Sequence, residues 1–288
     1  MKSSFKKFAV ACSLIISPVA LAADTIKFAA TEVAGLEALH TNFGPFKAKL
    51  EELTGKSVEF YPVSSRNSAV EALNSELLDF ALVGPAEYVI FRQRAKATPV
   101  VGWQRMNYFG KIFTTADSEL NSLTDFKGKT IAFGDVGSTS QHLAPAQLLS
   151  DHGLKQGVDY RALNLHRNVS VEAMLRGDVD AVAISSAYLD GIRKLFPNEG
   201  FKVIGRGPDL PNDQIVAGKH VSQSDIELVR RAFADNQEEM LNAIMSAEMN
   251  KKYTGGRFLT DVDDSDYDYI RRMYQSVGLM SFDKFLGE

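Results

Sequence analysis

The chain has 288 residues, of which 45% are hydrophobic and 24% charged, and its net charge is −4. A chain of this size and polarity folds as one or two domains with ample cores. Its acidic balance argues against a nucleic-acid-binding protein, which needs a basic face toward the phosphate backbone.

The first 22 residues have the pattern of a secretory signal peptide. Lys6 and Lys7 precede an apolar run at 8–19, and the small residues Ala20 and Ala22 supply the cleavage positions. The apolar run is too short to span a membrane. We therefore expect residues 1–22 to be removed on export and the mature protein to be periplasmic.

Cys12 is the only cysteine and lies inside this apolar run rather than at its end, which argues against a lipid anchor. The exported chain would then have no disulfide, no thiolate chemistry and no cysteine-bound metal. Removal of residues 1–22 takes away three lysines and no acidic residue, leaving 29 basic against 36 acidic residues and a net charge of −7. An anionic ligand would depend on local dipoles and well-placed donors, because the overall field of the protein repels it.

Short β-like segments alternate with helical patterns along the exported chain, which is typical of an α/β fold with mainly parallel sheets. The predicted strands are 25–31, 57–63, 80–83, 130–133, 160–165 and 179–185. The predicted helices are 46–53, 67–77, 85–94, 141–152, 169–176 and 187–196. The part after residue 222 is predicted to be mostly helical, with a loop at 253–257.

Two breaks in this alternation predict a discontinuous domain. The apolar runs 100–106 and 108–115 follow each other without a helix between them, and an irregular stretch occupies 205–211. Lobe I would comprise residues 23–108 and 207–288, and lobe II would be the insert 109–206. Since ligands of open α/β sheets bind at the carboxyl ends of the strands, the lobes would face each other across a cleft.

Segment 134–140 reads Gly-Asp-Val-Gly-Ser-Thr-Ser and joins the strand 130–133 to the next helix. Its small side chains leave backbone N–H groups uncovered at a helix start, where the helix dipole favours an oxyanion. Pro145 fits only in the first helical turn, so the helix should begin near Ser140 or Gln141. The alternative is that Ser138 or Ser140 only caps the helix.

Three further helix starts offer polar groups. In Gly-Pro-Ala-Glu-Tyr at 84–88, Tyr88 would either offer its hydroxyl to a ligand or cover the sheet edge. His166 and Arg167 end the strand 160–165, with Asn168 as the expected helix cap; they could bind an oxyanion, or Arg167 could be a solvated loop residue. For Ser-Ser-Arg-Asn-Ser at 64–68 a capping role is favoured.

No motif for catalysis or metal binding is convincing. An Asp-Ser-Asp-Tyr-Asp segment resembles the start of a calcium loop, but Tyr269 and Gln275 stand where glycine and glutamate are required, so an acidic helix start is expected. His142 and His152 have no partners at metal-site spacing. The serine-rich turn has no evident base, and the sequence has no Gly-x-Ser-x-Gly motif. We expect no enzyme, no metal and no cofactor.

Together these segments resemble the periplasmic phosphonate- and phosphite-binding proteins of ABC importers. The resemblance rests on Gly-Ser-Thr-Ser at 137–140 with Pro145 behind it, on Gly-Pro-Ala-Glu-Tyr-Val at 84–89, and on His166 ahead of Gly-Asp-Val-Asp-Ala at 177–181. Asn67 with Ala72 and Leu73 also fits the pattern, as does Leu-Thr-Asp-Phe-Lys-Gly-Lys at 123–129, and the segments run in order across most of the mature chain. The resemblance implies a two-lobed type II periplasmic binding protein fold that closes on its ligand like a hinged trap.

By this resemblance, Ser138, Thr139, Ser140 and His166 of lobe II would hold the oxyanion, and Tyr88 would meet it from lobe I. The resemblance also implies that family members which bind aminoalkylphosphonates have an acidic residue after the Val-Asp-Ala strand. This residue would meet the ammonium group of the ligand.

This chain reads Ser-Ser-Ala-Tyr at 185–188 instead. Asp213 could supply one carboxylate, but a buried amine would be poorly paired without a second. Gln141, at the same helix start as the serines, completes the set of expected ligand-binding residues. The expected ligand is therefore phosphite, methylphosphonate or a related small oxyanion.

The favoured hypothesis is a monomeric periplasmic solute-binding protein that delivers a phosphorus oxyanion to an ABC permease of the inner membrane. One alternative is the sensing subunit of a periplasmic histidine-kinase receptor, which needs the same capture and closure. Another is a binder of a different compact anion, such as an organic carboxylate. An enzyme acting on a phosphorylated substrate would need a base or a metal beside the serine-rich turn.

Overall fold

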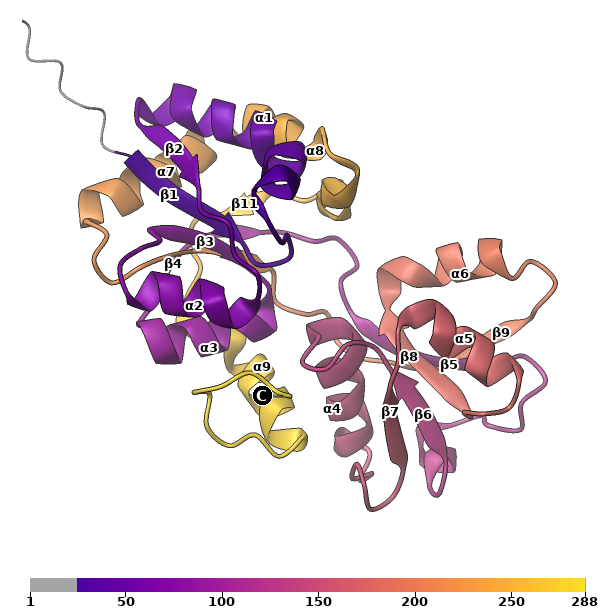
Figure 1. The fold of residues 1–288 in the computed structure, drawn as a ribbon. Helices are drawn as coiled ribbons and strands as arrows, with labels where there is room; N and C mark the ends of the chain where they lie inside the picture. Colours follow the sequence, from indigo (N-terminus) through magenta and orange to yellow (C-terminus); the bar gives the residue numbers. More distant parts are fainter. Residues whose placement is uncertain (1–24, 288) are drawn as a thin grey trace, which may run out of the picture.

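The computed structural model describes residues 25–287, so the predicted signal peptide at 1–22 lies outside the described residues. The strands form two separate sheets with helices on both faces, and each sheet is the centre of one lobe (Figure 1).

The sheet of lobe I has six strands in the order β11, β4, β10, β3, β1, β2. They are β1 (Thr25–Ala30), β2 (Ser57–Phe60), β3 (Phe80–Val83), β4 (Thr98–Trp103), β10 (Asp213–Ala217) and β11 (Phe258–Leu259). One face is covered by α1 (Leu36–Thr54), α7 (Gln223–Asp235) and α8 (Gln237–Met245), and the other by α2 (Arg66–Asn74), α3 (Pro85–Ala95) and α9 (Asp268–Ser276). Alternation along β1 divides the core, because Ile26 and Phe28 face the first group of helices and Ala29 faces the second.

The sheet of lobe II has five strands in the order β7, β6, β8, β5, β9. They are β5 (Gly110–Thr115), β6 (Thr130–Phe133), β7 (Arg161–Asn164), β8 (Ala181–Ser185) and β9 (Phe201–Arg206). The short helix η1 (Leu123–Phe126) and α4 (Ala144–Asp151) cover one face, and α5 (Arg167–Leu175) and α6 (Leu189–Leu195) cover the other. In β6, Ile131 and Phe133 point to the α4 side and Ala132 to the α5 side.

The predicted two-lobed α/β architecture is confirmed, and each sheet proves to be mixed. β1 runs parallel to β2 and β3, and β6 runs parallel to β7 and β8. In contrast, β10 is antiparallel to β3 and β4, and β5 is antiparallel to β8 and β9. The reason is that β5 and β10 enter their sheets directly from the other lobe, without the crossover helix that makes neighbouring strands parallel.

Some local predictions are wrong. β9, β10 and β11 were not predicted, because they flank the glycine- and proline-rich stretches that indicated irregular structure. Helix α1 begins at Leu36 rather than at 46, since Pro45 lies inside it instead of before it. Asn168 does not cap α5; the N-cap is His166, and the helix begins at Arg167.

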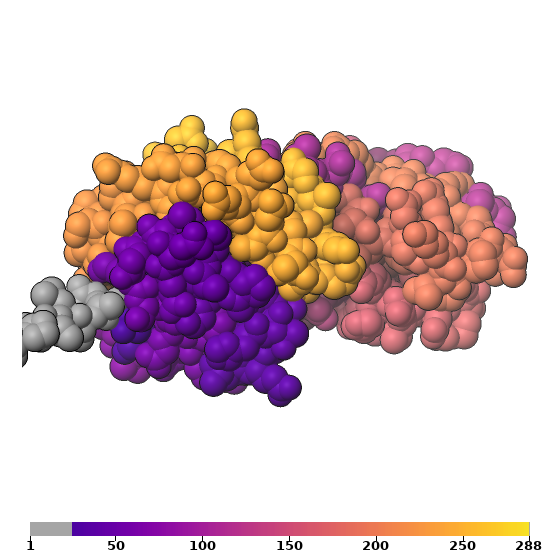
Figure 2. All heavy atoms as spheres, turned by 90° about the horizontal axis from the view of Figure 1, so that it is seen from above, coloured from indigo at the N-terminus to yellow at the C-terminus, as the bar shows by residue number. Residues whose placement is uncertain are grey.

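Two segments connect the lobes, 104–109 between β4 and β5 and 207–212 between β9 and β10. They run side by side, since the Leu210 N–H donates to the Tyr108 carbonyl at 2.8 Å and the Gly207 N–H to the Gly110 carbonyl at 2.9 Å. Figure 2 shows the discontinuity that results, with N-terminal residues (indigo) and C-terminal residues (orange) packed together in one lobe.

The lobes also touch through helix α9, which follows the sheet of lobe I but packs beside α4 of lobe II (Figure 1). Leu143 and Ala144 of lobe II lie in the same buried cluster as Met273 and Tyr274 of α9. Phe285, near the end of the chain, joins this cluster and is only 1% exposed. Among residues 25–287, no helix is long and apolar enough to cross a membrane.

Candidate functional site

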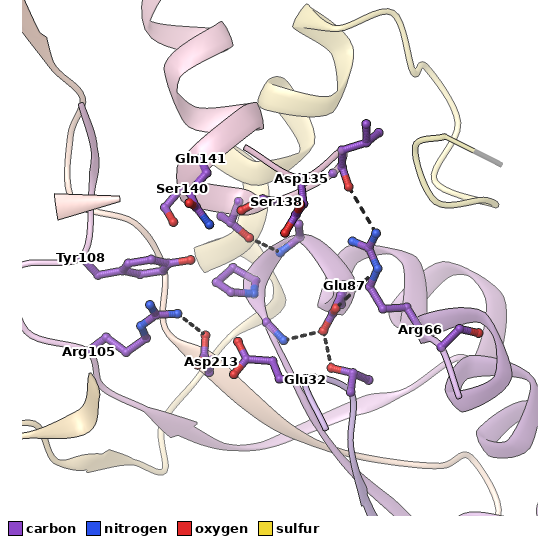
Figure 3. A pocket seen from close by; sticks show the side chains of 18 of the residues that line it. Glu32, Arg66, Glu87, Arg105, Tyr108, Asp135, Ser138, Ser140, Gln141 and Asp213 are labelled. Carbon is purple, nitrogen blue, oxygen red and sulfur yellow. Dashed lines mark hydrogen bonds and ion pairs between the residues drawn. The ribbon is translucent and has the colours of Figure 1, made fainter. Parts of the chain in front are cut away.

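A cavity of about 460 Å³ lies between the lobes (Figure 3). Its wall is built from the segments that follow the carboxyl ends of β1, β2, β3, β6 and β8, from the 104–109 connecting segment and from the start of β10. This is where the ligands of open α/β sheets bind.

The 134–141 turn forms the lobe II wall of the cavity. Gly137 has a φ of 79°, in the left-handed region that favours glycine. Ser138 is the N-cap of the π-helical turn η2 (Thr139–Leu143), yet its side chain makes no capping hydrogen bond. The first intrahelical bonds join the N–H groups of His142 and Leu143 to the Ser138 carbonyl. The N–H groups of residues 139–141 therefore have no acceptor within the helix, as at every helix start.

The start of α3 forms the facing wall in lobe I. Gly84 is its N-cap and Pro85 its first residue, as predicted. The Ala86 N–H donates to Thr139 Oγ1 across the gap at 3.1 Å. Two helix starts thus face one cavity from opposite lobes, and the positive ends of both helix dipoles favour an anion there.

The third side of the cavity lies at the connecting segments. The Arg105 guanidinium stacks on the Tyr108 ring at 3.7 Å and lies 3.4 Å from Asp213 Oδ1. Burial of the Tyr108 hydroxyl raises its pKa, so Tyr108 is neutral, and it lines the cavity together with Thr139 and Ser140.

Asp213 is 2% exposed and is surrounded by donors. Besides Arg105, its carboxylate accepts a hydrogen bond from the Tyr253 hydroxyl at 2.7 Å and lies 3.4 Å from Lys252 Nζ. Burial opposes ionisation of this carboxyl, but the two cations outweigh it and lower its pKa. Lys252 also pairs with Glu32, so two cations balance two carboxylates at this side.

Comparison with known proteins agrees with this geometry. The family model of the phosphonate ABC transporter periplasmic substrate-binding proteins matches residues 28–267. The chain belongs to this family. The predictions of the family, of a solute-binding component of an ABC transporter and of a protein that is not an enzyme are thereby confirmed.

Individual relatives of this phosphonate-family protein are distant. The phosphate-import protein PhnD of Mycolicibacterium smegmatis is 26% identical over 283 residues, which cover 88% of this chain and 86% of that protein. The binding protein component of a phosphonate ABC transporter from Pseudomonas aeruginosa has a TM-score of 0.64 at 20% identity, covering 87% of this chain and 85% of that one. PhnD1 from Prochlorococcus marinus, solved in complex with methylphosphonate, has a TM-score of 0.66 at 18% identity, covering 89% and 99%. These two structures share the fold.

Five of the seven predicted site residues of the phosphonate-family protein line the cavity. These are Ser138, Thr139, Ser140, Gln141 and Asp213. Thr139 and Ser140 are 7% and 5% exposed, so both are buried in the cavity wall. The contact of each with a ligand stays a prediction.

Tyr88 does not line the cavity. Its hydroxyl donates to Asp264 at 2.8 Å and its ring packs on Tyr267 at a centroid distance of 4.1 Å. A helix turns by about 100° per residue, so the neighbouring Glu87 lines the cavity while Tyr88 faces the short helix η5 (Asp264–Tyr267).

His166 is also outside the cavity wall, exposed at the start of α5. It follows β7, the outer strand of its sheet, so it lies to the side of the central strands whose ends meet the cavity. Its neighbour Arg167 stacks on the Tyr188 ring at 3.6 Å, and Tyr188 does line the cavity.

A Tyr88→Phe variant tests this placement. Its affinity for the ligand should stay within about twofold of the parent protein, because only the bond to Asp264 is lost. The free energy of unfolding should fall by about 1.5–3 kcal/mol, the usual contribution of a hydrogen bond to a charged group. Titration calorimetry measures the affinity, and urea unfolding measures the free energy of unfolding. A loss of affinity above about tenfold would contradict the placement of Tyr88 outside the ligand-binding site.

Several cavity residues were missed in the sequence. They are Glu32, Arg66, Glu87, Arg105 and Tyr108. A signal for the last two was present, because both lie in the break between the two apolar runs at 100–106 and 108–115. Ser65 caps α2 through a capping box, as favoured, and it also reaches the cavity wall.

The acidic segment before Tyr269 starts a helix, as predicted. Asp263 caps η5 by accepting the Ser265 N–H at 2.9 Å. Within residues 25–287, no group of three or more His, Cys, Asp or Glu side chains is placed to hold a metal ion.

His142 holds the 134–141 turn from behind. Its Nδ1 accepts the Gly137 N–H at 3.0 Å, which requires an unprotonated Nδ1. The ring is 2% exposed and packs edge-on against Phe133. Burial lowers its pKa to about 4, so the imidazole is neutral at physiological pH.

The lowered pKa of His142 predicts a pH dependence of stability. The unfolded chain takes up a proton as pH falls through the ordinary value of 6.5, whereas the folded chain takes it up only near 4. The free energy of unfolding should therefore decrease as pH is lowered from 6.5 to 4, by on the order of 3 kcal/mol. His142→Asn should keep an acceptor for Gly137 and lose this pH dependence, while His142→Leu should also weaken ligand binding. Urea unfolding from pH 7 to 4.5 measures the effect, and an unchanged profile in His142→Asn would contradict it.

Proposed function

We propose that this protein captures a small phosphorus oxyanion, such as phosphite or methylphosphonate, in the periplasm and delivers it to the permease of an ABC importer. The proposal includes export through a signal peptide at residues 1–22, a monomeric state and binding without a metal or cofactor. The ligand would contact Ser138, Thr139, Ser140 and Gln141 from lobe II.

One observation carries the proposal. The start of η2 and the start of α3 face the same cavity, and the Ala86 N–H and the Thr139 hydroxyl meet across it. Backbone N–H groups and hydroxyls around a helix start are suited to a tetrahedral oxyanion and need no net positive charge nearby. Tyr108 and the unshared N–H groups of Arg105 add donors from the third side.

The relatives support the class of ligand. One is named for phosphate import and another is solved with methylphosphonate, and both ligands are compact phosphorus oxyanions. A ligand that touches both lobes binds the closed form better than the open form and thereby shifts the equilibrium toward closure. The same closure would serve a sensor of a kinase receptor, but the family description names a transporter.

Titration calorimetry with phosphite, methylphosphonate, phosphate and sulfate tests the proposal. We expect micromolar or tighter binding of at least one phosphorus oxyanion. Weaker binding of all of them would contradict the proposal, and an organic anion identified by mass spectrometry in the purified protein would name the alternative ligand.

A further inference from the structure

A buried carboxyl group stands in the wall of the anion cavity. Glu87 lines the cavity and is 9% exposed. Its Oε2 accepts hydrogen bonds from the Thr31 hydroxyl at 2.5 Å and from the Gly84 N–H at 2.9 Å (Figure 3). The second bond caps α3, so Oε2 has a structural role.

The other oxygen, Oε1, forms a long ion pair with Arg66. The 3.8 Å between Oε1 and Arg66 Nε is too long for a hydrogen bond, and within residues 25–287 Oε1 accepts none. A ligand that fills the cavity and excludes water from Oε1 must offer it a hydrogen-bond donor, because desolvating this oxygen without one is unfavourable.

The charges around Glu87 are mixed. Burial is the largest influence and raises its pKa, Arg66 from α2 opposes this, and Glu32 after β1 adds to it; the result is a raised pKa. The other charged residues that line the cavity are Arg105 and Asp213 at the connecting segments and Asp135 in lobe II.

An anion bound beside Glu87 brings two negatively charged oxygens together in a buried site. Two such groups cannot both stay ionised in contact, so they share one proton. Phosphite, phosphonates and phosphate can bring this proton as a P–OH group near neutral pH. Sulfonates and sulfate have none to bring.

We propose that Glu87 Oε1 accepts a hydrogen bond from a P–OH group of the bound ligand, so that the site selects singly protonated phosphorus oxyanions and rejects sulfonates and sulfate. This inference rests on the proposed function and adds the chemical form of the ligand to it. A site built to pair with a ligand hydroxyl rejects an analogue without one strongly, because a buried acceptor is left unpaired.

The test is titration calorimetry with methylphosphonate between pH 5.5 and 8.5. In the parent protein, affinity should fall about tenfold per pH unit above the second ionisation of the ligand. Glu87→Gln should bind with little pH dependence, since the amide can donate to the dianion. The amide oxygen still accepts from Gly84 and Thr31, so the α3 cap is kept, and thermal unfolding checks that the variant folds.

Two further measurements complete the design. Glu32→Gln removes a negative charge from the same cavity and should retain the pH dependence of the parent protein. Methanesulfonate should bind the parent protein about 100-fold more weakly than methylphosphonate at pH 6, and Glu87→Gln should narrow this ratio at least about tenfold.

The outcomes separate the inference from the proposed function. Tight binding of methylphosphonate that does not vary with pH would overturn the role of Glu87 and leave the proposed function intact. A Glu87→Gln variant with the parent pH dependence and the parent discrimination against methanesulfonate would also overturn it. Failure of every phosphorus oxyanion to bind at any pH would overturn both.

Discussion

Replacement of Thr139 by valine is expected to weaken binding of methylphosphonate by about 100-fold. Valine keeps the shape of the side chain and removes its hydroxyl, so the Ala86 N–H loses its acceptor. An unpaired buried N–H costs about 1–3 kcal/mol, and a lost bond to a charged ligand costs a similar amount. Titration calorimetry at fixed pH measures the change.

Thr54→Val is the matched control, because it makes the same substitution at the end of α1, outside the cavity lining. There the hydroxyl donates to the Leu50 carbonyl and accepts the Lys56 N–H. Its affinity should equal that of the parent protein. If Thr139→Val also binds with the parent affinity, the 134–141 turn does not hold the ligand.

Replacement of Asp213 by asparagine is expected to lower the free energy of unfolding by about 3–5 kcal/mol. Asparagine has nearly the same shape but no charge, so the Arg105 guanidinium remains in the interior without its counter-ion. Lys252 keeps Glu32 as a partner, and the Tyr253 hydroxyl can still donate to an amide oxygen. Urea unfolding at pH 7 measures the loss.

Asp209→Asn is the control for this second substitution. Asp209 pairs with Arg206 at the surface, with a side chain 72% exposed, and such pairs contribute at most about 1 kcal/mol. Because the pKa of Asp213 is lowered in the folded protein, its contribution is present above the ordinary value of 3.8 and is lost as pH falls through the lower folded value. Equal stability losses in the two variants would contradict a buried charge network.

The sequence was sufficient for the parts of the site that are local in the chain. The Gly-Ser-Thr-Ser turn at 137–140 and the Gly-Pro start of α3 were predicted because small residues and proline have direct effects on a helix start. Each is a strand-to-helix transition, and the α/β topology places such transitions at one edge of a sheet.

The parts that were not predicted depend on contacts between distant segments or on helical phase. Arg105, Asp213 and Lys252 are far apart in the sequence and meet only because the chain leaves lobe I and returns to it. Whether Tyr88 or Glu87 faces the cavity depends on the rotation of α3 about its axis, which no local sequence pattern specifies. The contribution of a buried charge pair to stability likewise cannot be predicted from the sequence until its partners are known.

The end of the chain has a practical consequence for sensor design. Leu286 Cβ lies 3.8 Å from the position that a Cβ atom on Gly137 would take, and a Cβ atom on Gly287 would lie 3.0 Å from Val136 Cγ1. A bulky fluorescent protein fused behind these residues would press on the 134–141 turn and should alter the fluorescence signal before any ligand is added. If the proposed closure occurs, an environment-sensitive dye placed there should instead change its fluorescence when a ligand binds.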